Sequence, residues 1–216
     1  MPDIFDEVEE DLRAERARRL ARRYGGLGLG IVLLAIAAAG GVQGWRWWQA
    51  REAATAANTY MALNATAARE GADLAAAADG FAALGREAPS GYRTLARLRA
   101  AALKAEAGDT VAALALWDQV AQDQAAEPLY RDLASLLWVG HGLGTADPAQ
   151  LAARIAPLTQ PGNAWQAPAR ELAALVAIRR GETAEARQQL QALAGDAAAT
   201  PALRERAQRL AAGLGS

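Results

Sequence analysis

An uncharged stretch near the N-terminus constrains this 216-residue chain more than any other feature. Residues 24–45 contain no Asp, Glu, Lys or Arg, and Arg23 and Arg46 flank them. A helix of this length, at about 1.5 Å per residue, spans ~33 Å, and the hydrocarbon layer of a bilayer is about 30 Å thick. Aromatic residues of the kind that gather at membrane interfaces stand at both ends: Tyr24, Trp45, Trp47 and Trp48. The stretch therefore predicts one transmembrane helix over residues 24–45.

The distribution of arginine predicts how this helix is oriented. Six Arg precede the stretch within residues 13–23, whereas only Arg46 and Arg51 follow it closely. Because basic residues are retained on the cytoplasmic side, we expect residues 1–23 to form a cytoplasmic tail and most of the chain to lie on the other side of the membrane. The expected location is the bacterial inner membrane, with a single pass and a periplasmic domain. The alternative is a cleaved signal peptide, since residues 37–39 are all Ala; the long leader of mixed charge favours an uncleaved anchor instead.

One face of the predicted span carries only small residues. At 100° per residue a narrow arc holds Gly26, Gly30, Ala37, Gly40 and Gly44. Such a stripe lets a second helix approach closely, which is how transmembrane helices associate. We therefore expect contact with another membrane protein; glycine enrichment from the genome's base composition is the alternative.

The tail before the span has the pattern of an amphipathic helix. Acidic residues come first and arginines afterwards, which complements the helix dipole. Four apolar residues fall close to one face: Ile4, Phe5, Val8 and Leu12. Two interpretations remain open, a helix resting against lipid headgroups or solvent and a helix docking onto a cytoplasmic partner.

The rest of the chain predicts an all-α fold. Ala, Leu, Arg, Glu and Gln dominate it, and β-branched residues are sparse. Gly and Pro signals divide this part into helices near 46–70, 72–87, 91–107, 110–125, 128–142, 148–158, 164–180, 183–195 and 201–213. We expect the first of these to continue the span as a stalk over 46–70, and a separate domain over 71–216.

An internal repeat indicates how these helices are arranged. The turns Gly108-Asp109-Thr110 and Gly181-Glu182-Thr183 lie 73 residues apart, and Pro128 and Pro201 share that separation. After each turn a small residue, a large residue and another apolar residue follow at the same spacing. These residues are Ala113, Trp117 and Val120 in one copy and Ala186, Leu190 and Leu193 in the other. An earlier stretch has the same spacing, with Ala77, Phe81 and Leu84. This spacing resembles the second helix of a tetratricopeptide repeat. It predicts degenerate repeats of this type; another helical array or bundle stays open.

The junction after the span and one later segment add a family resemblance. The run Gly44-Trp45-Arg46-Trp47-Trp48, and the segment 158–165 before a helix pair joined by Gly181-Glu182, are similar to the YfgM-like ancillary subunits of the Sec translocon. The resemblance implies an inner-membrane protein that associates with the translocon and a periplasmic folding factor and assists exported chains. It also implies that the cytoplasmic tail contacts regulators.

The inventory of reactive side chains argues against an enzyme. The chain has no Cys and one His, which excludes thiol chemistry and histidine metal clusters, and we expect no cofactor. A balance of 23 basic and 24 acidic residues argues against a nucleic-acid partner. His141, within the glycine-rich segment 140–144, is predicted to be an exposed loop residue. Asp118 and Asp123 are expected on a solvated face.

These observations favour a non-enzymatic, membrane-anchored interaction protein. Its partners would be a membrane complex, for which the translocon is favoured, and a periplasmic folding factor or peptide segments. Arg93 and Arg97 are candidates to face a bound peptide, because the first helix of each repeat lines the concave side of such a domain. The alternative function is a structural accessory or assembly subunit of another inner-membrane complex, such as respiratory, photosynthetic or division machinery.

Overall fold

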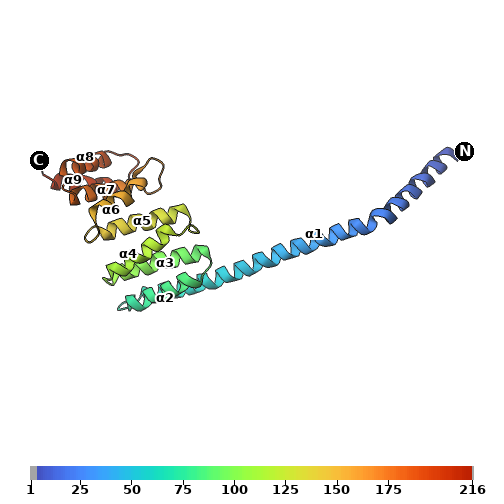
Figure 1. The fold of residues 1–216 in the computed structure, drawn as a ribbon, viewed down its shortest axis with the longest axis horizontal. Coiled ribbons are helices and arrows are strands. Elements are labelled where there is room, and N and C mark those ends of the chain that lie inside the picture. The colour runs from blue at the N-terminus through green and yellow to red at the C-terminus, as the bar shows by residue number, and fades with distance from the viewer. Residues whose placement is uncertain (1–3, 216) are drawn as a thin grey trace. The chain divides into compact units, whose positions relative to one another are not determined.

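A computed structural model describes the backbone of residues 4–215 and the side chains of Arg22 and residues 33–215. Over this part the chain forms helices and turns and no strand, which confirms the all-α prediction (Figure 1). The elements are α1 (Ile4–Ala67), α2 (Leu74–Glu87), α3 (Ser90–Glu106), α4 (Thr110–Gln122), α5 (Pro128–Gly142), α6 (Pro148–Ile155), the 3-10 helix η1 (Ala156–Thr159), α7 (Gln166–Arg179), α8 (Thr183–Ala194) and α9 (Pro201–Gly213).

The chain divides into two compact units, Met1–Glu52 and Ala53–Ser216, and α1 contributes to both. The last turns of α1 are part of the second unit's core. Tyr60 lies edge-on to Phe81 with ring centroids 5.1 Å apart, and Leu63 and Ala67 pack with α2 and α3. The segment predicted as a stalk thus includes the first helix of the repeat domain.

From there the helices follow one another as antiparallel pairs. A glycine in the left-handed conformation joins the two helices in three pairs: Gly71, Gly108 and Gly181, with φ of 71°, 86° and 82°. Only glycine adopts this conformation without strain, so the turn recurs where the sequence supplies it. Asp109 then begins α4 by accepting a hydrogen bond from the Ala112 backbone N–H at 3.1 Å. The turn that ends one helix is thereby also the cap of the next.

The pair α5–α6 is a further copy that the sequence pattern did not identify. Its apolar residues have the same spacing as the others and are buried: Leu151, Ile155 and Leu158. Leu replaces the usual Ala at the first position because α5 offers Gly142 opposite, where a Cβ would lie 3.4 Å from the Leu151 Cδ2. Pro157 ends α6 after eight residues, since proline has no N–H to donate, and the chain continues as η1.

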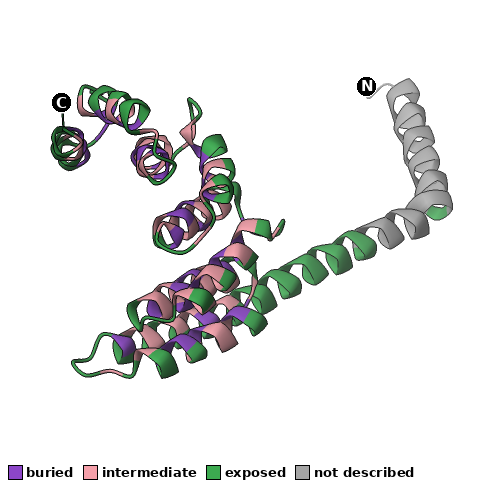
Figure 2. Cartoon of the chain, turned by 60° about the vertical axis from the view of Figure 1, so that its left-hand side comes forward, coloured by how far each residue is buried: buried purple, intermediate pink, exposed green. Residues whose placement is uncertain are grey.

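Each part of the core lies between neighbouring helices. One cluster joins α1, α2 and α3, the next α3, α4 and α5, the third α5, α6, η1 and α7, and the last α7, α8 and α9. Figure 2 shows the buried residues on the facing sides of these helices. The large side chains at the second position of three copies, Phe81, Trp117 and Leu190, have no exposed surface, and Ile155 of the α5–α6 copy is 3% exposed. This is the nearest-neighbour organisation of a helical-repeat domain.

Polar contacts repeat with the same period. Five pairs join residues 35 or 36 positions apart: Asn64–Arg99, Asp118–Arg154, Leu129–Trp165, Leu143–Arg179 and Glu171–Arg206. An Arg–Asp ion pair also occurs at equivalent positions of two copies, as Arg97–Asp123 and, 73 residues later, as Arg170–Asp196. Successive copies therefore stack in a constant register.

Candidate functional site

The part of α1 that the structure describes before the repeat domain has an apolar surface. Its large apolar side chains are exposed: Leu33, Leu34, Ile36, Val42, Trp45, Trp47 and Trp48. Figure 2 shows this part of α1 in the colour of exposed residues. The Trp45 and Trp48 rings contact each other with centroids 5.2 Å apart, and the Arg51 guanidinium lies over the Trp47 ring. Contiguous exposed apolar surface usually marks a site of interaction with a membrane or a protein.

Only part of the predicted span falls on described side chains. Ala37, Gly40 and Gly44 are exposed, and a Cβ at either glycine would have no neighbour within 4 Å. The remaining predicted residues lie outside the side chains that the structure describes: Ile4, Phe5, Val8, Leu12, Tyr24, Gly26 and Gly30. Among the described residues, no helical stretch is both long and apolar enough to cross a membrane. The transmembrane helix and the tail's docking face stay predictions.

The arginines predicted to face a peptide bind their own chain. Arg93 Nε donates to the Ala88 carbonyl at 3.2 Å. Arg97 Nε donates to the Gly85 carbonyl at 3.0 Å, and its Nη1 to the Asp123 carboxylate at 3.0 Å. These bonds join α2, α3 and the end of α4. A role in peptide binding stays a prediction to which these contacts lend no support.

Two further expectations need correction. His141 is exposed, as expected, but it lies in the last turn of α5 and not in a loop, and its ring contacts the buried Trp117 ring with centroids 4.6 Å apart. Asp118 and Asp123 do not belong to a merely solvated face, because Asp118 pairs with Arg154 and Asp123 with Arg97. Arg154 is 36 residues from Asp118 and Arg97 is 26 residues from Asp123, so only the stacking of helices brings them together.

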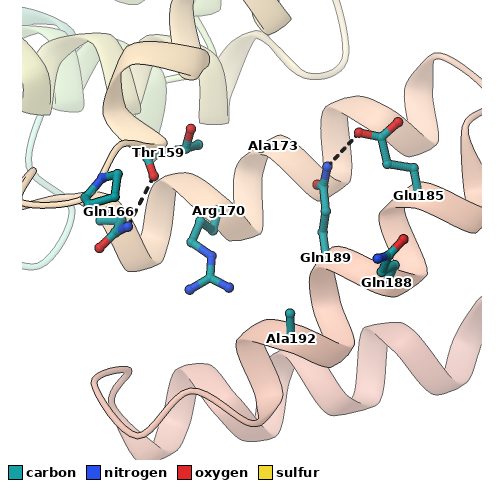
Figure 3. Close-up of a pocket in the computed structure, with 9 residues that line it drawn as sticks. Thr159, Gln166, Arg170, Ala173, Glu185, Gln188, Gln189 and Ala192 are labelled. Carbon is teal, nitrogen blue, oxygen red and sulfur yellow. Dashed lines mark hydrogen bonds between the residues drawn. The ribbon is translucent and has the colours of Figure 1, made fainter.

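A hollow of about 520 Å³ opens between α7, α8 and the loop that follows η1 (Figure 3). Three amides, a guanidinium and a carboxylate line it: Gln166, Gln188, Gln189, Arg170 and Glu185. A smaller hollow of about 170 Å³ lies next to it and shares Glu185 and Gln189 in its lining. The helix α6 is only eight residues long, and the chain continues after it as the 3-10 helix η1 and a loop beside the hollow.

The side chains around the hollow are held by bonds to one another and to nearby residues. Gln166 Nε2 donates to the Thr159 carbonyl at 3.3 Å, and Gln189 Nε2 donates to Glu185 Oε1 at 2.9 Å (Figure 3). Arg170 Nη1 donates to the Asp196 carboxylate at 2.6 Å. Hydrogen bonding by the Ala198 N–H, helped by Arg170, lowers the pKa of Asp196 below its ordinary value. The hollow thus gathers hydrogen-bond donors and acceptors from α7 and α8.

Sequence reasoning missed this site, although the repeat contains a signal for it. Gln189 stands 73 residues after Leu116, which packs against the core of α2 and α3. The last copy thus has an amide where the copy after Gly108 has an apolar packing residue and the α5–α6 copy has Arg154. Within the described part of the chain, no group of three or more His, Asp or Glu side chains is placed to hold a metal ion.

Stacked antiparallel helix pairs with this turn, spacing and register define a helical-repeat protein of the tetratricopeptide type. A family model for the tetratricopeptide repeat-like domain matches residues 19–211, and the chain belongs to this family. The comparisons find no curated protein and no solved structure that matches this chain. Domains of this type are typically protein-interaction modules and not catalysts.

Proposed function

We propose that this protein is a non-enzymatic, membrane-anchored interaction protein. Its α1 helix holds the repeat domain at the bacterial inner membrane, with the N-terminus in the cytoplasm and the repeats in the periplasm. The repeat domain binds protein partners there, as an ancillary subunit of the Sec translocon and of periplasmic folding factors. The family supports a role in protein–protein interaction, and the resemblance of the Trp-rich junction supports the choice of partner.

The observation that carries the anchoring is the apolar surface of α1. Trp45, Trp47 and Trp48 are 59%, 62% and 46% exposed, next to Arg46 and Arg51. Burying apolar surface is favourable by about 25 cal/mol per Å², so this surface favours a bilayer or a partner helix over water. Tryptophan beside arginine is the composition of a membrane interface.

Mild crosslinking in gently solubilised membranes, followed by mass spectrometry, tests the proposal. We expect the chain in the membrane fraction after an alkaline wash, crosslinked to translocon and periplasmic folding-factor peptides. A chain that washes off, or one that recovers neither kind of peptide, contradicts it.

One observation favours the second candidate, a structural accessory of another membrane complex. The described glycines of the small-residue face, Gly40 and Gly44, are open on the helix surface. In that case the membrane helix makes the main contact, and replacing both glycines by Leu abolishes association. If the repeat domain does the binding, the same double variant retains most of its crosslinked partners.

A further inference from the structure

We propose that one end of the repeat domain rests on the surface of a phospholipid bilayer. This end, called the loop end, consists of the first residues of α3, α5, α7 and α9 and the connections that precede them, residues 88–89, 123–127, 160–165 and 195–200. The inference rests on the proposed function, which supplies the anchor, and it adds a second contact with the same membrane.

The first argument is the place where α1 enters the domain. Both α1 and α3 lie antiparallel to α2, and the Asn64–Arg99 bond aligns them in the 35-residue register of the stack. Ala53, the first residue of the second unit, is therefore at the loop end. Four residues separate it from Trp48, and a link of this length spans at most about 18 Å. Whatever angle the two units take, a bilayer that holds Trp48 is close to this end.

The second argument is the scarcity of charge at the loop end. Its connections contain three charged residues, and two of them, Asp123 and Asp196, are paired with Arg97 and Arg170. The third, Glu127, is exposed. Bringing a charged group out of water is costly, so a surface with few charges approaches a bilayer at the least cost.

The opposite end of the helices, called the turn end, is different. It consists of the connections 68–73, 107–109, 143–147 and 180–182. These connections contain seven charged residues: Arg69, Glu70, Asp73, Asp109, Asp147, Arg180 and Glu182. The two ends of the same helices therefore differ in how easily they leave water.

The third argument is an apolar pair at the loop end. Leu129 is 43% exposed, and Trp165 Nε1 donates to the Leu129 carbonyl at 2.9 Å, which holds the indole beside it. Tryptophan is typical of membrane interfaces. The turn end also has an exposed apolar side chain, Val111, but it follows closely after the charged Asp109. The combination of apolar side chains with few charges occurs at the loop end.

The fourth argument is the sign of the charge at the loop end. Three arginines bind neutral acceptors of its connections, the Ala88 carbonyl, the Gln124 side chain and the Ala199 carbonyl; they are Arg93, Arg131 and Arg204. Two carboxylates oppose them, Glu127 and Asp132, of which Asp132 accepts from the Asn163 amide. The balance is three positive charges against two negative ones, or +1.

The same balance at the turn end is negative. Its connections contain two arginines and five carboxylates, and Arg179 binds the Leu143 carbonyl there. Three positive charges against five negative ones give −2. An anionic phospholipid surface attracts the loop end and repels the turn end, which orients the domain on the bilayer.

Spin labelling of the full chain in vesicles tests this surface. The chain has no Cys, so Leu129→Cys and Val111→Cys each place one nitroxide label, at the loop end and the turn end. The vesicles contain phosphatidylethanolamine, phosphatidylglycerol and a small share of nickel-chelating lipid, and no other protein. The 13 residues of α4 separate the two ends by about 20 Å. We therefore expect nickel to enhance relaxation of the label roughly threefold or more at position 129 compared with position 111.

Two pairs of added carboxylates test whether charge determines the contact. All four alanines are exposed. Ala125→Glu with Ala164→Glu changes the loop end, and we expect it to remove at least half of the enhancement at position 129. Ala68→Glu with Ala107→Glu is the matched control at the turn end and should leave that enhancement unchanged. Thermal midpoints check that both double variants fold.

Equal enhancement at the two labelled positions, or a larger one at position 111, overturns the inference. Equal effects of the two double variants also overturn it. A label at position 129 that is far from lipid in vesicles, but is shielded from a water-soluble thiol reagent in native membranes before labelling, shows that the loop end meets a protein instead.

The two proposals fail separately. If crosslinking recovers translocon and folding-factor peptides but the two labels respond equally, the bilayer contact is wrong and the proposed function stands. If the label at position 129 lies close to lipid but membranes yield neither kind of peptide, the proposed partners are wrong and the bilayer contact stands. A chain that an alkaline wash removes from the vesicles overturns both.

Discussion

At the scale of single residues, one buried carboxylate holds the last helix in place. The Glu171 side chain, on α7, is only 8% exposed, and both Nε and Nη2 of Arg206 on α9 donate to its two oxygens. Hydrogen bonding to Glu171 raises the pKa of Arg206 above its ordinary value. A buried carboxylate that loses its partner is destabilising. Arg206 is about half-exposed, which lets solvent screen part of that effect.

Replacing Arg206 by Ala should therefore lower the free energy of unfolding by about 1–3 kcal/mol. Arg209 is the matched control, because it lies on the same helix and meets Glu205 only at 3.9 Å with both side chains 71% exposed. Arg209→Ala should change the free energy by less than about 0.5 kcal/mol. Urea denaturation followed by circular dichroism measures both, and equal losses would show that the α7–α9 pair has no special role.

The paired Asp196 predicts a dependence on pH. Its pKa in the folded chain is lowered from 3.8 by the Ala198 N–H and by Arg170. A carboxyl group whose pKa is lower in the folded chain stabilises the fold at pH values above its pKa in the unfolded chain. This stabilisation is lost as the pH falls through the pKa of the folded chain. The wild type should have a higher urea midpoint than Asp196→Asn. This difference should be constant above about pH 5 and should shrink as the pH falls below the ordinary pKa of an aspartate. An advantage that is the same at pH 3 and pH 7 would rule this out.

At the scale of the elements, the repeated turn starts two helices in different ways. Asp109 caps α4 with a side-chain hydrogen bond, whereas Glu182, in the same position before α8, makes none and pairs with Arg180 instead. The shorter aspartate is the better cap because its carboxylate reaches the first N–H groups of the helix.

Asp109→Ala should therefore destabilise the repeat domain by about 1 kcal/mol. Glu182→Ala removes only an exposed ion pair and should cost less than about 0.5 kcal/mol. Thermal unfolding of the two variants decides between them. A larger loss for Glu182→Ala than for Asp109→Ala would mean that the ion pair, and not the cap, starts these helices.

At the scale of the whole repeat domain, stability is local because each core joins only neighbouring helices. Leu193 belongs to the cluster of α7, α8 and α9, and Leu103 to the cluster of α1, α2 and α3. Both side chains have no exposed surface. In a stack of this kind a defect spreads to adjacent copies first.

Leu193→Ala should cost about 2–5 kcal/mol at its own end of the stack. We expect faster hydrogen exchange in α8 and α9 and unchanged exchange in α2 and α3. Leu103→Ala is the control and should give the opposite distribution. Uniform acceleration over all helices in either variant would contradict nearest-neighbour stability.

Much of this architecture follows from the sequence alone. The helices from α2 to α9 begin and end within a few residues of the predicted limits, because glycine turns, aspartate caps and prolines act over one or two turns of backbone. The copies around Gly108 and Gly181 were recognisable from their spacing. The pair α5–α6 was missed as a copy because it has Leu151 in place of Ala and a longer turn before Asp147.

Only the tertiary structure decided which side chains meet. Nothing near Arg97 in the sequence indicates that Asp123 binds it, and nothing near Gln189 indicates that a short α6 leaves its surroundings open. Backbone hydrogen bonds and caps join residues a few positions apart, so local sequence determines the helices. Ion pairs and hollows depend on how helices some 35 residues apart are rotated and spaced, which the packing of residues such as Trp117 and Gly142 sets.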